Sequence, residues 1–185
     1  MPEKEIYIVI TQTGTILSRV LKRITGAEYN HASVSLRPDL RLMYSFGRKN
    51  PYNPWWGGFV QESPEFGTFK RFSETRAIVL SVPVDAVTYD EMERTLREMF
   101  QNRNDYHYDT VGLLLAAFNI SYKRDRHFYC SDFVRDVLVR FGIEESGFFE
   151  PIVKPVHFLD IPDGKVIYKG KLRDYSLAAV KQQAS

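Results

Sequence analysis

Two short segments of alternating character, joined by a tight turn, constrain the fold of this chain more than any other feature. Residues 31–36 and 42–46 alternate polar and apolar side chains, and Pro38-Asp39 lies between them. This pattern predicts an antiparallel hairpin, in which residues that face each other have the same parity. One face is then expected to carry Ala32, Val34, Leu36, Leu42, Tyr44 and Phe46, and the other His31, Ser33, Ser35, Met43 and Ser45.

The rest of the chain predicts an α+β fold, with an antiparallel β-sheet packed against helices. Thr88 is expected to cap one helix, with Glu91 as its capping-box partner. Asn50 to Gly58 is interpreted as an ordered aromatic loop because it holds prolines, glycines and Trp55 and Trp56. Periodicity predicts further strands at 6–11, 77–82 and 165–168, and helices at 15–24, 88–100, 110–118 and 130–141.

Length and composition predict one globular domain over residues 1–185, with 181–185 as a frayed polar tail. The 185 residues are 44% hydrophobic, enough to bury a core. The 25 basic and 23 acidic residues are spread along the chain, so nucleic acid is not expected as a partner. The apolar run near the N-terminus is too short for a signal peptide or a transmembrane segment, so we expect a cytoplasmic protein.

Cys130 is the only cysteine, which excludes an intramolecular disulfide and zinc sites with several thiolates. It lies in the first turn of a predicted helix, where free backbone N–H groups and the helix dipole stabilise a thiolate. An inert packing role is the alternative, because Cys130 shares the inward face of Phe133 and Val137. Asp132 opposes a thiolate, and the nearby Arg126 and His127 partly offset this effect.

His31 is the candidate general base because it begins a strand on a face of serines and a methionine. A plain exposed histidine is the alternative interpretation. His107, His127 and His157 are the other candidates to approach the thiol. Asp105, His107 and Asp109 alternate along the chain and are a weak signal for a metal site. Because no further His or Cys is clustered with them, we expect these three to be solvated loop residues, and we expect neither a metal nor a cofactor.

Three segments together resemble the circularly permuted NlpC-type papain-like cysteine peptidase superfamily, in its YiiX-like and lecithin:retinol acyltransferase-like branch. They are Tyr29-Asn30-His31-Ala32-Ser33-Val34, Tyr44-Ser45-Phe46, and Phe128-Tyr129-Cys130-Ser131-Asp132-Phe133-Val134. In that branch the histidine strand precedes the cysteine helix, as it does here. The resemblance covers roughly residues 6–142 and implies a papain-like fold.

The resemblance implies that Cys130 is the nucleophile and His31 its base. A third residue orients the histidine in that superfamily, and the predicted register makes Ser45 our candidate, although a neutral hydroxyl holds an imidazolium weakly. Tyr29, Tyr129, Trp55 and Trp56 are candidates for substrate contacts.

The function expected from these residues is a cysteine hydrolase that acts on an amide or ester through an acyl-enzyme. Its substrate would be a small molecule, a peptide or a lipid-like compound. An acyltransferase is the nearest alternative. A binding module whose catalytic site has decayed is the alternative from another class, and Ser45 is its main support.

Overall fold

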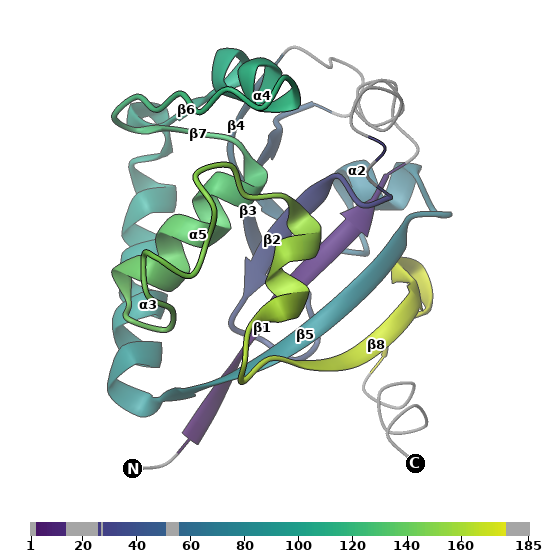
Figure 1. Ribbon diagram of the computed structural model, residues 1–185. Coiled ribbons are helices and arrows are strands. Elements are labelled where there is room, and N and C mark those ends of the chain that lie inside the picture. The colour runs from purple at the N-terminus through teal and green to yellow at the C-terminus, as the bar shows by residue number, and fades with distance from the viewer. Residues whose placement is uncertain (1–2, 14–25, 27, 51–55, 177–185) are drawn as a thin grey trace.

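The computed structural model describes residues 3–13, 26, 28–50 and 56–176. Six strands form one antiparallel sheet in the order β4-β3-β2-β1-β5-β8 (Figure 1). The expected α+β class with an antiparallel sheet packed against helices is therefore confirmed. The strands are β1 (Glu3–Gln12), β2 (His31–Ser35), β3 (Met43–Arg48), β4 (Gly57–Glu62), β5 (Arg76–Asp85) and β8 (Lys165–Lys171).

The predicted hairpin forms with the predicted register. Val34 lies opposite Tyr44, and Ser35 lies opposite Met43, so facing residues have the same parity. The other pairing partner of β2 is β1, which in turn pairs with β5 along its whole length. β1 is therefore a central strand, and β4 forms one edge of the sheet.

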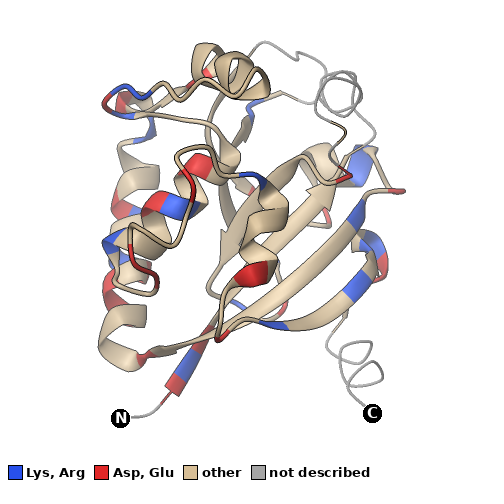
Figure 2. Ribbon diagram, viewed as in Figure 1, with Lys and Arg blue, Asp and Glu red and all other residues tan. Residues whose placement is uncertain are grey.

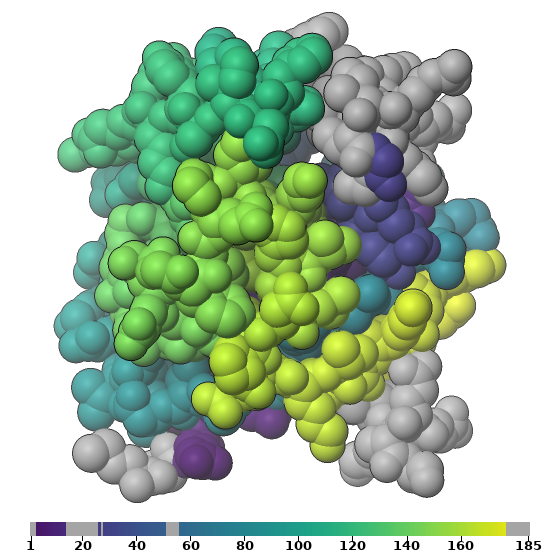
Figure 3. All heavy atoms as spheres, viewed as in Figure 1, coloured from purple at the N-terminus to yellow at the C-terminus, as the bar shows by residue number. Residues whose placement is uncertain are grey.

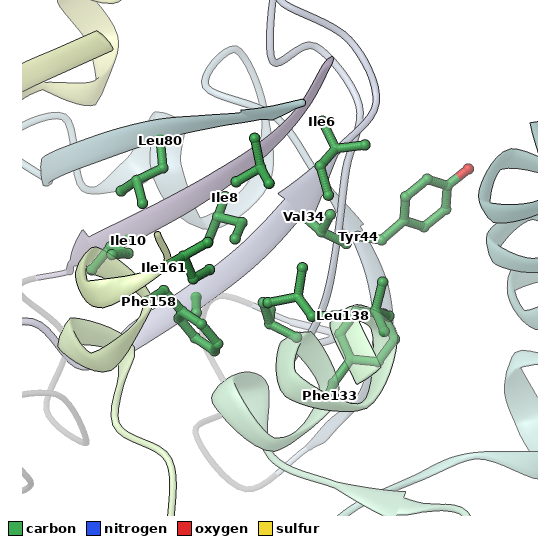
Figure 4. Packing of buried hydrophobic residues seen from close by; sticks show 14 of the residues in the cluster. Ile6, Ile8, Ile10, Val34, Tyr44, Leu80, Phe133, Leu138, Phe158 and Ile161 are labelled. Carbon is green, nitrogen blue, oxygen red and sulfur yellow. The ribbon is translucent and has the colours of Figure 1, made fainter. Parts of the chain in front are cut away.

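The sheet buries apolar side chains on both faces. On one face, Ile8 and Val34 pack with side chains of α3 (Ala86–Gln101), α5 (Cys130–Arg140) and η2 (Pro155–Asp160), as Figure 4 shows for part of the cluster. On the other face, Val9 and Met43 pack against α2 (Gly67–Arg71) and η3 (Leu172–Asp174). In the space-filling view, the yellow-green residues of η2 lie over the sheet between α5 and β8 (Figure 3).

The helix over residues 88–100 was predicted in the right place but with the wrong cap. Asp85 caps α3, because its carboxylate accepts hydrogen bonds from the backbone N–H groups of Val87 (2.9 Å) and Thr88 (3.0 Å). The Thr88 hydroxyl donates to the same carboxylate at 2.6 Å. A carboxylate three residues upstream competes successfully with the predicted Thr88 cap, since it accepts from two N–H groups at once.

β4 was not predicted as a strand. Its first two residues are Gly57 and Gly58, which were assigned to the aromatic loop; the strand forms because it pairs with β3 over six residues. The predicted helix at 15–24 lies outside the described residues. A short parallel pair, β6 (His107–Tyr108) and β7 (His127–Phe128), flanks α4 (Thr110–Ala117).

α4 carries no Lys, Arg, Asp or Glu, whereas both signs of charge are interspersed on α3 and α5 (Figure 2). Within the described ranges, no helix combines the length and the apolar character needed to cross a membrane.

Candidate active site

Cys130 begins α5, as the sequence predicts. Tyr129 is the N-cap residue of α5, but its side chain accepts no hydrogen bond from the helix. The first backbone N–H groups of α5 are therefore not capped by the Tyr129 side chain. The thiol is 5% exposed, and its sulfur lies 3.8 Å from the carbonyl oxygen of Asn30, the residue before His31. Phe133, Val134 and Val137 on the inward face of α5 pack into the core and fix the helix against β2 and β3.

His31 begins β2, where its backbone lies opposite Thr11 of β1. Its imidazole Nε2 lies 2.9 Å from Oε2 and 3.2 Å from Oε1 of Glu62, at the end of β4. The side chains of this pair are only 14% and 11% exposed. Cys130 also acts on this ring, because its charge contributes to raising the pKa of His31.

The charges in this cluster stabilise an imidazolium. Burial alone would lower the pKa of His31, but the Glu62 carboxylate and the hydrogen bonds to Cys130 and Glu62 raise it to about 10. Burial alone would also raise the pKa of Glu62, and the positive His31, with help from the Ser33 hydroxyl, lowers it instead. The site can therefore hold a carboxylate beside an imidazolium, close to the Cys130 thiol.

The side chain that binds the His31 ring belongs to Glu62, and the predicted Ser45 does not reach it. Ser45 lies on the same face as His31, as the register predicts, but its buried hydroxyl forms no hydrogen bond with it. Glu62 lies on β4, so its side chain reaches His31 on β2 across the intervening strand β3. Gly47 leaves room for it: a Cβ at Gly47 would lie 3.0 Å from Glu62 Oε1.

Ser33 is a second residue of the site that the sequence did not single out. Its hydroxyl donates to Glu62 Oε2 at 2.7 Å and lies 3.3 Å from His31 Nε2. The sequence could have indicated Ser33, because it lies two residues after His31 and both side chains were predicted to share one face of the hairpin. Glu62 offered no comparable signal, because the register of β4 depends on an unpredicted strand.

A pocket opens at the thiol. The predicted substrate contacts Tyr29 and Tyr129 are buried and line it beside Cys130. Ala116 of α4 and Val153 after α5 complete its largely apolar wall. Trp56 is 56% exposed and lines a different pocket, and Trp55 lies outside the described residues.

The other histidines have other partners. His107 and His127 lie opposite each other across the β6–β7 pair, with ring centroids 5.0 Å apart, and the His157 ring accepts from the backbone N–H of Lys154. Asp109 caps α4 and pairs with Arg124 at 2.6 Å.

No group of three or more metal-ligating side chains forms in the described part of the chain. Asp132, the acidic neighbour of the thiol, forms an ion pair with Arg135 at 2.6 Å, which compensates its charge.

No family model matches the sequence, and the search of curated proteins also finds no match. The function must therefore be argued from the geometry of Cys130, His31 and Glu62.

Proposed function

We propose that this protein is a cysteine hydrolase with a permuted papain-like fold, in which Cys130, His31 and Glu62 form the catalytic triad. The observation that carries the proposal is the buried hydrogen bond between His31 Nε2 and Glu62, beside a cysteine at a helix N-terminus whose charge acts on the same imidazole. A nucleophile, a base and a group that orients the base are the three parts that such catalysis needs.

The mechanism follows from these positions. The Cys130 thiolate attacks the carbonyl carbon of an amide or ester, and the backbone N–H groups at the start of α5 are placed to stabilise the oxyanion. The C–N or C–O bond breaks, the leaving group takes the proton from the His31 imidazolium, and an acyl-enzyme remains. His31 then takes a proton from water, the hydroxide attacks the acyl carbon, and the thiolate is restored.

Glu62 supports a hydrolase over a binding module. The main argument for a decayed site was a neutral Ser45 in the orienting position, and a carboxylate holds an imidazolium more strongly than a hydroxyl does. Acyl transfer uses the same acyl-enzyme and differs only in the acceptor. The candidate substrates remain small-molecule, peptide or lipid-like amides and esters.

The test is the rate at which iodoacetamide alkylates Cys130 between pH 5 and pH 9. A thiolate paired with an imidazolium is expected to react fast and almost independently of pH across this range. His31→Ala should remove the fast reaction at pH 6, whereas His157→Ala, whose ring bonds to the backbone of Lys154, should leave it intact. Slow alkylation of the native protein, or no effect of His31→Ala, would contradict the proposed mechanism.

A further inference from the structure

A second hollow, separate from the pocket that contains Cys130, opens beside Glu62. Its volume is about 570 Å³, large enough for part of a substrate. It lies at the edge of the sheet, where β3 ends and β4 begins. Cationic and aromatic side chains dominate its wall, among them Arg48, Lys49, Trp56, Phe66, Phe100 and Arg103.

The three cations of this hollow have no acidic partner. In the described structure, which includes every Asp and Glu of the chain, Arg48, Lys49 and Arg103 form no ion pair. Arg103 donates to the carbonyl oxygen of Phe100 at 3.1 Å and lies over its ring. Glu62 is the only acid in the wall, and it is bound to His31.

Arg48 is the least solvated of the three cations. Its side chain is partly buried, and burial lowers its pKa from the ordinary value, although a guanidinium remains charged at neutral pH. A partly buried charge without a partner is costly. An anion bound beside Arg48 would remove this cost.

Glu62 connects the hollow to the reacting centre, because it lines the hollow and its Oε2 lies 2.9 Å from His31 Nε2. Arg48 lies opposite Gly57 across the β3–β4 pair, and the Tyr108 ring packs so closely on Gly57 that a Cβ there would lie 2.7 Å from the ring. Burial raises the pKa of the Tyr108 hydroxyl, and the charges of Cys130 and Arg48 shift it in opposite directions.

We propose that this hollow binds an anionic group, a carboxylate or a phosphate, on the substrate of Cys130, and that Arg48 determines this specificity. Arg binds both anions through two parallel hydrogen bonds. Trp56 and Phe66, both half exposed, supply apolar surface for the part of the substrate next to the charge. This inference rests on the function proposed for Cys130.

The test compares two reagents that alkylate the same thiol, the anionic iodoacetate and the neutral iodoacetamide. The ratio of the iodoacetate rate to the iodoacetamide rate measures the electrostatic potential around Cys130, and the measurement needs no known substrate. Arg48→Gln is expected to lower the ratio about fivefold, and Arg48→Lys should retain most of it. Arg94→Gln is the matched control, because Arg94 is exposed on α3 and does not line the hollow. An unchanged ratio in Arg48→Gln, or an equal fall in Arg94→Gln, would overturn the inference.

Competition identifies the source of the charge. At constant ionic strength, N-acetylglutamate and inorganic phosphate should slow the iodoacetate reaction of the native protein more than that of Arg48→Gln. Stronger competition by N-acetylglutamate indicates a carboxylate on the substrate, and stronger competition by phosphate indicates a phosphate. If neither competes, the hollow does not bind anions, whatever the ratio shows.

Two further outcomes are separable from these. If thermal unfolding shows that Arg48→Gln does not fold, the double variant Lys49→Gln/Arg103→Gln, which changes two exposed residues, replaces it. A fall of about twofold in the ratio of the iodoacetate to the iodoacetamide rate supports the inference, and an unchanged ratio overturns it. Slow alkylation of the native protein by both reagents would instead refute the function proposed for Cys130.

Discussion

Replacing Glu62 by glutamine tests whether the carboxylate activates the thiol. The amide keeps the size of the side chain and one hydrogen bond to His31, but it removes the charge. At the observed 2.9 Å between His31 Nε2 and Glu62 Oε2, the attraction is about 6 kcal/mol at an effective dielectric constant of about 20. We expect about half of it to be lost, since the amide still accepts a hydrogen bond.

A loss of about 3 kcal/mol corresponds to roughly a hundredfold fall in the imidazolium–thiolate form. Burial then dominates the environment of His31 and favours the neutral ring. The iodoacetamide reaction of Cys130 at pH 6 should therefore slow about a hundredfold in Glu62→Gln. Thermal unfolding of the same sample shows whether the variant is folded.

Ser45→Ala is the matched control for this experiment, because Ser45 lies on the same face of the sheet without a hydrogen bond to His31. It should retain the alkylation rate within about threefold. A native rate in Glu62→Gln would refute the reasoning. So would an equal loss in Ser45→Ala, which would return the orienting role to the serine.

Two further predictions concern the same cluster. Because the folded protein holds the His31 pKa at about 10 against an ordinary 6.5, the imidazolium stabilises the fold below pH 6.5 and this contribution is lost as the pH rises through 10. Urea unfolding should show the free energy of unfolding falling between pH 7 and pH 10, with a flatter profile in His31→Ala. Gly47→Ala places a Cβ 3.0 Å from Glu62 Oε1 and should slow alkylation at pH 6 about tenfold. Gly147→Ala, which meets no atom within 4 Å, should keep the native rate; equal rates in the two variants would contradict this packing argument.

The parts of the site that depend on local pattern were predictable from the sequence. The alternation around Pro38 predicted the β2–β3 register, since a shift by one residue would have turned every apolar side chain away from the core. Helical spacing from Cys130 to Phe141 predicted that the thiol lies in the first turn of α5. Both predictions need only neighbouring residues.

The orienting residue was not predictable in this way, because it depends on two pairings between distant segments. Glu62 is 31 residues from His31 and reaches it only because β4 pairs with β3, with Met43 opposite Glu62. The two glycines that begin β4 weaken the local strand signal. Ser45 had the correct face, but parity does not reveal that a longer side chain from the next strand fills the space over Gly47.

The burial of His31 and Glu62 bears on whether the site is catalytic. Removing two charges from water costs several kcal/mol for each ion, and the attraction between them often only offsets that cost, so a buried ion pair is a weak source of stability. The sheet could have packed apolar side chains here, as it does a few ångströms away around Phe69 and Met43. An ion pair that is costly to bury, and that lies beside a cysteine at a helix N-terminus, is accounted for by the activation of that thiol. The buried imidazolium favours the hydrolase over the binding module, since a module without chemistry has no use for it.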